Sequence, residues 1–316
     1  MNRMDISVVI PVYNEKGNIP KLHASLDSVL QKTGKSYEII FVDDGSTDGT
    51  TDELRGICSR SQNTSCVIFR RNFGQTAAIS AGINKATGGV VITMDADMQN
   101  DPEDIPKLLK RMDEGYDIVS GWRRSRKDPL ISKRIPSFFS NWLARRLTRL
   151  DIHDSGCSLK AYKGDAIKGL RLYGEMHRYI PALLYNRGYT VGEVEVRHRP
   201  RLHGKTKYGV SRLIKGFMDL LYIKFWSTYS TRPLHFFGTV GTAQIFIGVL
   251  IGLYKVLVEY LYLHVPLNVG PMLLLSVMML ITGLQFIIFG FIVEIQIRTY
   301  YNSGVETDYT IREIIN

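Results

Sequence analysis

The sequence predicts an α/β fold, in which helices cover both faces of a mostly parallel sheet and two transmembrane helices follow. Two observations lead to this prediction. Over the first 120 residues, short β-branched or apolar runs alternate with stretches of helical periodicity, a pattern typical of a parallel sheet between two layers of helices. Nearer the C-terminus, the apolar runs 234–258 and 269–297 each exceed the roughly 20 residues that a helix needs to cross a bilayer.

The predicted strands are β-branched or apolar runs of strand length. They are Ile6–Val12, Tyr37–Asp43, Ser65–Arg70, Val90–Asp95 and Tyr116–Ser120. Helices are predicted between them, at 18–32, 49–60, 75–86 and 102–113. In such a sheet, ligands bind beyond the carboxyl ends of the strands. We therefore expect the loops after the first, second and fourth strands to meet in one site.

The loop after the fourth strand carries Asp95 and Asp97. Alternate residues at a strand end point to the same side, and carboxylates are ligands that Mg²⁺ and Mn²⁺ prefer. Gln99 could add a third oxygen or orient a bound water. A metal held there would bridge the phosphates of a nucleotide and stabilise a departing diphosphate. A polar turn with solvated acids is the alternative.

The loop after the second strand offers further carboxylates. Asp43 and Asp44 could accept hydrogen bonds from a nucleobase or a ribose hydroxyl, but Asp residues here could also cap the next helix. We assign Asp43 and Asp44 to a ligand and Asp48 to capping. The first strand is not followed by Gly-x-Gly-x-x-Gly, and no Gly-Lys-Ser/Thr loop occurs, which disfavours dinucleotide and P-loop sites.

The basic excess of the chain lies in one segment. Residues 133–233 contain 20 Lys/Arg and 7 Asp/Glu, whereas the parts before and after it have net charges of −1 and −2. A nucleic-acid partner could explain a basic region. Its position before a membrane span instead favours anionic lipid headgroups and phosphorylated substrates as partners. Because Lys and Arg are enriched on the cytosolic side of membrane spans, the basic segment and both termini are expected in the cytosol. The short connector Glu259–Asn268, which lacks Lys and Arg, should face the other side.

Two stretches of this basic segment, 133–150 and 212–226, predict amphipathic helices at the membrane interface. Helices packed on the domain with a solvated basic face are the alternative. For the apolar runs the alternative is a pair of buried core helices, but soluble helices of that length normally show a polar face. No signal peptide precedes the first strand, so the domain is expected to stay where it is made.

Cysteines and glycines carry two further expectations. Cys58, Cys66 and Cys157 are too few and too scattered for a disulfide framework or a zinc site, and are expected to be small apolar fillers in a reducing compartment. Glycines in the first apolar run could allow close helix packing, within one subunit or in a homo-oligomer. They are Gly238, Gly241, Gly248 and Gly252.

Taken together, several stretches of the chain resemble glycosyltransferase family 2, and within it the polyprenyl-phosphate sugar transferases related to dolichyl-phosphate mannose synthase and bactoprenol glucosyltransferase. The matching stretches are 9–15, 42–46, 71–74, 95–99 with Pro102-Glu103, 120–123, 154–158 and 201–207. Each is weak, but their order over about residues 5–230 is specific. Lys205 departs from the pattern, because relatives often carry an acidic or small residue there.

The resemblance implies a GT-A fold and an inverting, metal-dependent transfer of a hexose. The sugar would pass from a UDP- or GDP-linked donor to a polyprenyl phosphate on the cytosolic leaflet. Together with the charge and hydropathy patterns, the resemblance predicts a nucleotide-sugar-binding core at 1–132, an acceptor-side part with the interface helices at 133–233, a two-helix anchor at 234–298 and a cytosolic tail at 299–316. The implied ligands of Mg²⁺ or Mn²⁺ are Asp95, Asp97 and Gln99.

The resemblance also implies other site residues. The nucleotide-binding residues would be Pro11, Tyr13, Glu15, Val42, Asp44, Asp95 and Ala96. The phosphate-binding residues would be Arg123, Arg201 and Lys207, with Arg134 and Ser137 in a looser alignment. Asp97, Arg123 and Asp154 are the candidate catalytic residues. Asp154 could orient the acceptor or take a proton from it, or cap the turn at Ser155-Gly156.

The expected chemistry fits these residues. A phosphate acceptor is mostly ionised at neutral pH, so it needs little help from a base. Bringing two anions together requires a metal and Arg or Lys side chains. Glu175-Met176-His177-Arg178 is expected to form an internal ion pair with a structural role.

A transferase with another acceptor, such as a polysaccharide, and an inactive membrane scaffold are the alternative functions. Processive polysaccharide synthases of this superfamily carry a Gln-x-x-Arg-Trp motif, and its absence from the sequence argues against the first alternative. The intact Asp95, Asp97 and Arg123 argue against the second.

Overall fold

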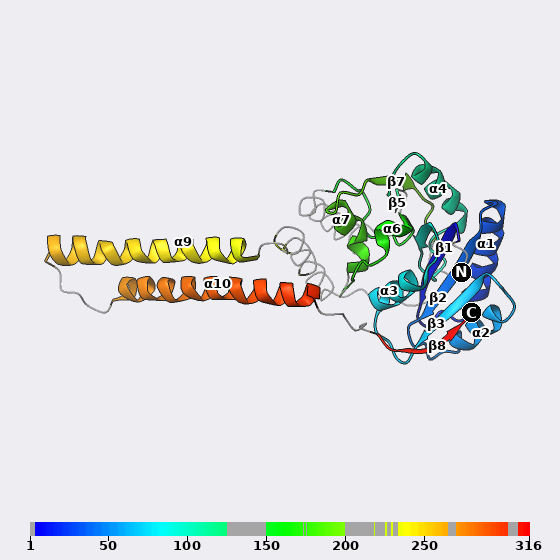
Figure 1. Ribbon diagram of the computed structural model, residues 1–316, viewed down its shortest axis with the longest axis horizontal. Helices are drawn as coiled ribbons and strands as arrows, with labels where there is room; N and C mark the ends of the chain where they lie inside the picture. The colour runs from blue at the N-terminus through cyan, green and yellow to red at the C-terminus, as the bar shows by residue number, and fades with distance from the viewer. Residues whose placement is uncertain are drawn as a thin grey trace. The chain divides into compact units, whose positions relative to one another are not determined.

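The computed structural model describes residues 4–124, 150–172, 174, 176–199, 218, 225, 229, 233–264, 270–302 and 309–316. The chain divides into two units. The first comprises Met1–Lys224 with Thr307–Asn316, and the second comprises Phe225–Glu306 (Figure 1). The expected boundary at residue 132 and the two expected interface helices at 133–150 and 212–226 lie almost entirely outside the described residues.

The first unit is built on a sheet with the strand order β7-β5-β6-β4-β1-β2-β3-β8. The strands are β1 Ile6–Val12, β2 Tyr37–Asp43, β3 Thr64–Phe69, β4 Val90–Thr93, β5 Ile118–Trp122, β6 Lys160–Lys163, β7 Val191–Glu195 and β8 Ile311–Ile315. Strands β4, β1, β2 and β3 are mutually parallel, as are β5 and β7. Only β6 and β8 run antiparallel to their neighbours among the strands described. The predicted mostly parallel sheet is confirmed.

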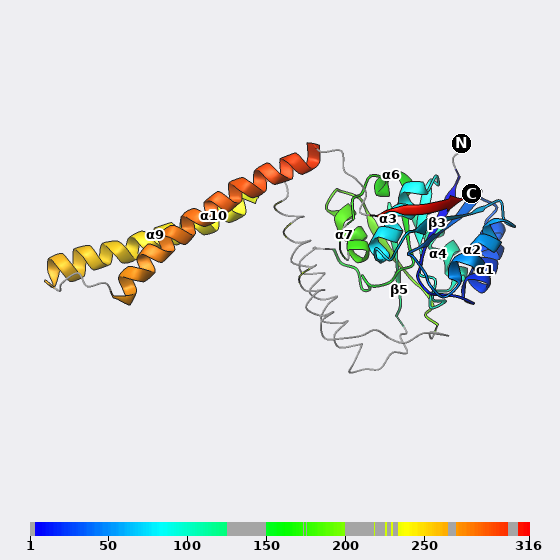
Figure 2. The same ribbon diagram turned by 90° about the horizontal axis from the view of Figure 1, so that it is seen from below.

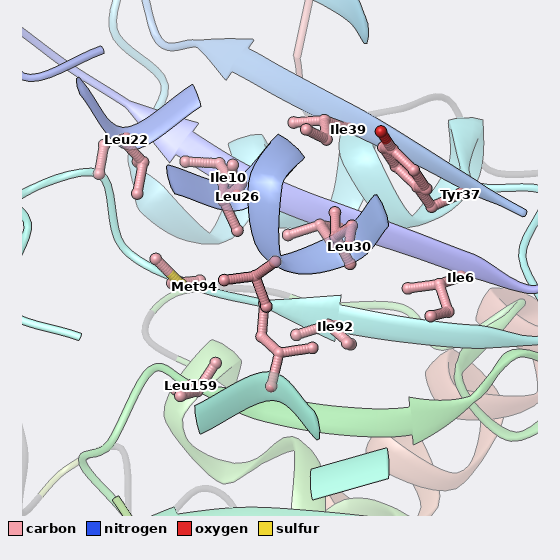
Figure 3. Packing of buried hydrophobic residues seen from close by; sticks show 14 of the residues in the cluster. Ile6, Ile10, Leu22, Leu26, Leu30, Tyr37, Ile39, Ile92, Met94 and Leu159 are labelled. Atoms are coloured by element: carbon pink, nitrogen blue, oxygen red, sulfur yellow. The ribbon is translucent and has the colours of Figure 1, made fainter. Parts of the chain in front are cut away.

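Helices cover both faces of this sheet, as predicted. They are α1 Ile19–Lys32, α2 Thr50–Cys58, α3 Gln75–Lys85, η1 Pro102–Asp104, α4 Ile105–Asp113, α6 Gly164–Ile167, η3 Met176–Tyr179 and α7 Ile180–Tyr185. One core cluster joins α1, α2 and α4 to the sheet, and Leu22, Leu26 and Leu30 of α1 lie over β1 and β2 in Figure 3. A second cluster joins α3, α6 and α7 to the opposite face.

Helix α3 approaches the sheet closely because it presents small residues. A Cβ atom at Gly82 would lie 2.2 Å from Val9 Cγ1, so glycine is required at this point of contact. Neighbouring alanines are buried on the same helix. The N-terminus of α3 is thereby fixed close to the carboxyl ends of β1 and β2, where the site is expected.

The C-terminal residues correct one prediction. We expected a cytosolic tail over 299–316, but α10 (Pro271–Asn302) extends to Asn302 and Ile311–Ile315 forms the edge strand β8 beside β3 (Figure 2). Tyr309 stacks on Phe69 with ring centroids 5.0 Å apart, and Glu313 binds Arg55 at 2.8 Å. A five-residue strand gives a weak sequence signal, and its pairing with β3 spans most of the chain.

The cysteines correct a second expectation. Cys58, at the end of α2, and Cys66, in β3, form a disulfide, so they are not both simple apolar fillers. The two residues are eight apart in sequence, and the short α2–β3 connection brings their side chains together in the core. Cys157 is free and buried, as expected.

The second unit contains α9 Pro233–Leu253, the π-helix η4 Tyr254–Tyr262 and α10. The stretches Pro233–Tyr262 and Pro271–Ile297 are long and apolar enough to cross a membrane, and only 11% of each apolar window is buried. Such exposure contradicts the alternative of buried core helices. The 21 residues of α9 measure about 31 Å at 1.5 Å per residue, close to the thickness of a hydrocarbon core.

Close packing of α9 on α10 explains three of the four glycines. A Cβ atom at Gly241 would lie 2.5 Å from Gly283 O, one at Gly248 would lie 3.0 Å from Ser276 O, and one at Gly252 would lie 3.0 Å from Ser276 Oγ. Ser276 Oγ donates a hydrogen bond to Gly248 O at 2.7 Å. These contacts lie within one chain, so they account for the small residues without a second subunit. A homo-oligomer stays a prediction.

Candidate active site

The structure brings the three predicted loops to one edge of the sheet. Strands β4, β1 and β2 are neighbours and parallel, so their carboxyl ends meet. The N–H of Asp44 donates to Val12 O at 2.8 Å, and that of Met94 donates to Val9 O at 3.1 Å. The candidate nucleotide-binding residues of β1 and β2, Pro11 and Val42, lie side by side in register.

The first two loops are joined by side-chain hydrogen bonds. Asn14 N–H donates to Ser46 Oγ at 2.9 Å, and Asn14 Oδ1 accepts from Thr47 N–H at 2.9 Å. Asn14 has a φ of 55°, a left-handed conformation that Asn tolerates better than most residues. On either side of it, Tyr13 is 39% exposed and Glu15 accepts from Asn18 Nδ2 at 2.7 Å. Tyr13 is therefore accessible to a ligand at the rim of this edge.

The carboxylates of Asp43 and Asp44 hold loop backbone. Asp43 accepts from Ser46 N–H at 2.9 Å, and Asp44 accepts from the N–H groups of Phe73 and Gly74 at 2.6 and 2.9 Å. Burial raises the pKa of Asp44, although these two backbone hydrogen bonds lower it. Asp43 and Asp44 are thus partly committed to loop structure, and their contact with a ligand stays a prediction.

Asp48 contacts the start of α2, as expected, but the N-cap position itself is occupied by Gly49. Its Oδ1 accepts from both the N–H and the hydroxyl of Thr50, the first residue of α2, at 3.0 and 2.5 Å. Its Oδ2 accepts from Lys16 N–H at 3.2 Å. Asp48 therefore ties the start of α2 to the loop after β1.

Asp95 and Asp97 follow the end of β4. Asp95 Oδ1 accepts from Gln75 Nε2 at 2.7 Å, and Asp97, only 6% exposed, accepts from Gln99 N–H at 3.1 Å. Burial and the neighbouring Asp97 raise the pKa of Asp95, while Ser158, Arg123 and Arg178 lower it. Ala96, between the two acids, is buried.

The backbone of this loop is strained at Met98. Its φ is 61°, and the left-handed region costs a non-glycine residue roughly 1–2 kcal/mol. Strain of this kind persists where surrounding contacts impose it and is frequent at functional sites. Here it turns the chain sharply between Asp97 and Gln99.

The donor set of this loop fits a divalent cation completed by substrate oxygens. Mg²⁺ is usually held in proteins by one or two carboxylates together with substrate phosphates, and Asp95 and Asp97 supply two. Within the described ranges, no group of three or more His, Cys, Asp or Glu residues could hold a metal by itself. A cation would also relieve the repulsion between the two carboxylates. Gln99 follows them in the same loop, and its backbone carbonyl accepts a hydrogen bond from Arg199 N–H at 2.9 Å.

Arg123 and Asp154 form a buried, bidentate ion pair. Arg123 Nε and Nη2 donate to Asp154 Oδ2 and Oδ1 at 2.7 and 3.0 Å. The side chains are 16% and 3% exposed. Burial lowers the pKa of Arg123, but the hydrogen bond and charge of Asp154 outweigh it and raise the pKa above its usual value. Arg123 is therefore a fixed cation, and the carboxylate of Asp154 orients it.

Several residues near Asp95 were not selected from the sequence. Gln75 donates to Asp95, and Ser158 accepts from Asn100 Nδ2 at 2.6 Å. Lys160, 2% exposed, donates to the carbonyls of Ser155 and Arg178 at 3.0 and 3.2 Å. Burial lowers the pKa of Lys160 to about 8. Among the described residues, the hydrogen bonds of Lys160 go to backbone carbonyls, which a sequence pattern does not reveal.

The acceptor side of the predicted site falls mostly in other segments. Arg134, Ser137, Arg201, Lys205 and Lys207 lie outside the described residues, as does Glu175 of the expected internal ion pair. Residues 197–199, which precede Arg201, are nevertheless hydrogen-bonded to the loop that carries Asp95 and Asp97 and to the residues just after it. Arg199 N–H donates to Gln99 O at 2.9 Å, and the Arg199 side chain donates to Asp101 at 2.6 Å. Arg197 N–H donates to Asp104 at 2.6 Å.

Known proteins resemble this chain over nearly its whole length. A family model described as glycosyl transferase family 2 matches residues 7–170. The dodecaprenyl-phosphate galacturonate synthase of Rhizobium johnstonii is 38% identical over 99% of this chain and 94% of its own length. The undecaprenyl-phosphate 4-deoxy-4-formamido-L-arabinose transferase of Shewanella sediminis is 33% identical over 98% and 92%.

Solved structures share the fold of this chain over most of its length. A mannosyltransferase from Pyrobaculum calidifontis, in complex with GDP-Man and Mn²⁺, has a TM-score of 0.51 at 19% identity. The match covers 71% of this chain and 68% of that chain. This likeness concerns the fold, and it confirms the fold class that the sequence predicts.

Proposed function

The chain belongs to glycosyl transferase family 2, and we propose that it transfers a sugar from a nucleotide sugar to a polyprenyl phosphate, with inversion at the anomeric carbon and with Mg²⁺ or Mn²⁺. The observation that carries this proposal is the sheet edge itself. Two adjacent carboxylates, Asp95 and Asp97, lie at the carboxyl ends of parallel strands, in the electrostatic field of the fixed cation Arg123. The two relatives that match the full chain are both named as acting on a polyprenyl phosphate.

The donor would bind across the ends of β1, β2 and β4. Pro11, Tyr13, Glu15, Val42 and Asp44 would contact the base and ribose, and the diphosphate would bind the metal at Asp95 and Asp97. That metal would neutralise charge on the diphosphate as it departs. The solved mannosyltransferase of similar fold contains GDP-Man and Mn²⁺, which supports this choice of donor class and cation.

The transfer would proceed in a single displacement. A phosphate oxygen of the acceptor attacks the anomeric carbon, the new C–O bond forms as the bond to the diphosphate breaks, and the configuration inverts. The acceptor phosphate is already largely ionised at neutral pH, so Asp154 is not required as a base. Its contribution would be to orient Arg123, whose charge favours the approach of two anions.

The lipid acceptor accounts for the second unit. The helices α9 and α10 would anchor the protein beside its substrate, with the catalytic unit in the cytosol. The chain leaves the first unit before α9 and re-enters its sheet as β8. Two membrane spans would return the chain to the side from which it started, so both connections to the first unit would lie on the same side of the membrane. The basic excess of residues 133–233 would face anionic headgroups and the acceptor phosphate.

The proposal is tested with the full chain purified in detergent. Radiolabelled UDP- and GDP-sugars, including uronate and pentose donors, are incubated with undecaprenyl phosphate and Mn²⁺ or Mg²⁺. We expect label in an organic-extractable glycolipid, with the anomeric configuration opposite to that of the donor. Chelation of the metal, or Asp97→Asn, should reduce the rate at least about 100-fold. Absence of glycolipid from every donor would refute the proposal, and a normal cellular role of Asp97→Asn would favour a scaffold.

A further inference from the structure

A carboxylate on β7 holds the backbone that carries Asp154. Glu193 Oε1 accepts from the N–H of His153 at 2.8 Å and from that of Asp154 at 3.4 Å. The other oxygen, Oε2, lies 2.8 Å from His153 Nδ1. The Glu193 side chain is only 14% exposed, so solvent screens these contacts little. One carboxylate therefore fixes both the main chain and the imidazole ring of the residue before Asp154.

His153 also connects the two chain segments that form the ion pair between Arg123 and Asp154. Its ring stacks on Trp122, the last residue of β5, with centroids 4.3 Å apart and planes inclined by 21°. Trp122 directly precedes Arg123, as His153 directly precedes Asp154. Glu193 and Trp122 thus hold His153 from two sides, and the chain just before each partner of the ion pair is fixed.

The ion pair depends on this framework because its geometry is exacting. Arg123 Nε and Nη2 donate to two different oxygens of Asp154, at 2.7 and 3.0 Å, and Arg123 N–H donates to one of them at 3.4 Å. A bidentate contact fixes the direction of both planar groups. Glu193 is itself set by the sheet, since β7 pairs with β5 (Figure 1) and Glu193 lies opposite Ser120. A movement of the Asp154 backbone would therefore redirect the guanidinium.

We propose that Glu193 is a positioning residue for the transfer. By holding the backbone of His153 and Asp154, it sets the direction in which Asp154 presents Arg123 to the anionic groups of the substrates. This inference rests on the proposed function and deepens it. The contribution of Glu193 lies in the position of its carboxylate rather than in its charge, which sits behind Asp154 and would by itself repel a phosphate.

Three substitutions separate position from charge. Glu193→Ala removes all the contacts of the carboxylate. Glu193→Asp keeps the charge but draws the carboxylate back by one methylene, away from the two N–H groups. Glu193→Gln removes the charge but keeps the length and an oxygen that can accept from both N–H groups. The control is Glu195→Ala, which makes the same charge change on β7 at a side chain that is 53% exposed and binds Arg124.

The assay measures kcat and KM for glycolipid formation by the full chain in detergent, with the thermal unfolding of each variant recorded. Glu193→Ala and Glu193→Asp should each lower kcat/KM by about tenfold, because residues that orient a functional group typically have effects of this size. Glu193→Gln should restore most of that loss. Glu195→Ala should stay within about threefold of the wild type, since exposed pairs contribute little.

The decisive comparison repeats Glu193→Ala in the Arg123→Gln background. If Glu193 acts through Arg123, its removal should then cost less than about twofold, because the guanidinium that it positions is already absent. A merely structural role predicts the same loss in both backgrounds.

Equal losses in the two backgrounds would overturn this inference alone, as would wild-type activity of Glu193→Asp or a Glu193→Gln as slow as Glu193→Ala. If Glu193→Ala does not fold, Glu193→Asp and Glu193→Gln decide: a slow Asp variant with a faster Gln variant supports the positioning role, and the reverse order overturns it. A wild type that forms no glycolipid from any donor would overturn the proposed function, and this inference with it.

Discussion

The ion pair between Arg123 and Asp154 permits a test of what Asp154 does in the reaction. If Asp154 only orients Arg123, removing either residue removes the same interaction. Two charge-assisted hydrogen bonds, at 2.7 and 3.0 Å, join side chains that are 16% and 3% exposed. Breaking a buried pair by removing one partner costs about 3–5 kcal/mol. Part of that cost should appear as lost transition-state stabilisation, which we expect to be about 100-fold in kcat/KM for Arg123→Gln and for Asp154→Asn.

The decisive measurement is a double-mutant cycle. Initial rates of glycolipid formation are compared for the wild type, the two single variants and Arg123→Gln/Asp154→Asn. A positioning role predicts that the double variant is no slower than the worse single variant, within a few-fold. If Asp154 acted as an independent base, the losses would multiply to about 10⁴-fold. That multiplication would refute the positioning role.

An exposed pair beside the site supplies the matched control. Arg124 binds Glu195 at 2.8 Å, with side chains 68% and 53% exposed. Exposed pairs contribute little to stability because solvent screens them. Arg124→Gln changes the same net charge one residue away from Arg123. Its kcat/KM should therefore remain within about threefold of the wild type.

Two further predictions concern stability. Asp117 accepts from Lys163 Nζ and Thr190 N–H at 2.7 and 2.8 Å, and the Lys163 hydrogen bond is the largest cause that lowers its pKa to about 2. The stabilisation is present above pH 3.8 and is lost as the pH falls towards 2, so the unfolding temperatures of wild type and Asp117→Asn should converge over that range. Because the Asp117 side chain is 20% exposed, the free energy of unfolding of the wild type should exceed that of Asp117→Asn by about 1–2 kcal/mol near pH 7. A difference that stays constant down to pH 2 would contradict this. Gly82→Val would place side-chain atoms against Val9 and should destabilise by about 1–3 kcal/mol. Gly56→Ala, in open space on α2, should instead stabilise by about 0.5–1 kcal/mol in thermal unfolding; equal effects would contradict the packing argument.

The part of the fold that the sequence predicts well is the part with local signals. The strands β1, β2 and β4 are buried on both faces, so nearly every residue in them is apolar and the run is easily recognised. Strand β5 was predicted two residues early, at Tyr116 instead of Ile118. Its pairing with β7 begins at Ile118 and Val191, and that partner is remote in sequence.

Strands β6, β7 and β8 lacked such signals. The four residues of β6 begin and end with lysine, and β7 contains a glycine and two glutamates, with only the glycine fully buried. Each is short, and each is stabilised by partners far away in the chain. The same reason explains the missed site residues. Asp95 and Asp97 are adjacent to a recognisable strand, whereas Gln75 and Ser158 reach Asp95 only through tertiary structure.

The antiparallel strand β6 explains why a site forms where it does. In a purely parallel sheet, residues that precede a strand lie at the opposite edge from those that follow one. Because β6 runs against β4 and β5, its first residue, Lys160, pairs with Thr93 at the end of β4 and with Ser120 near the end of β5. The residues before β6, including Asp154 and Ser158, are thereby delivered to the carboxyl edge. Arg123, which follows β5, forms its ion pair with Asp154 at this edge. The antiparallel direction of β6 thus brings Arg123 and Asp154 to the same edge of the sheet as Asp95 and Asp97.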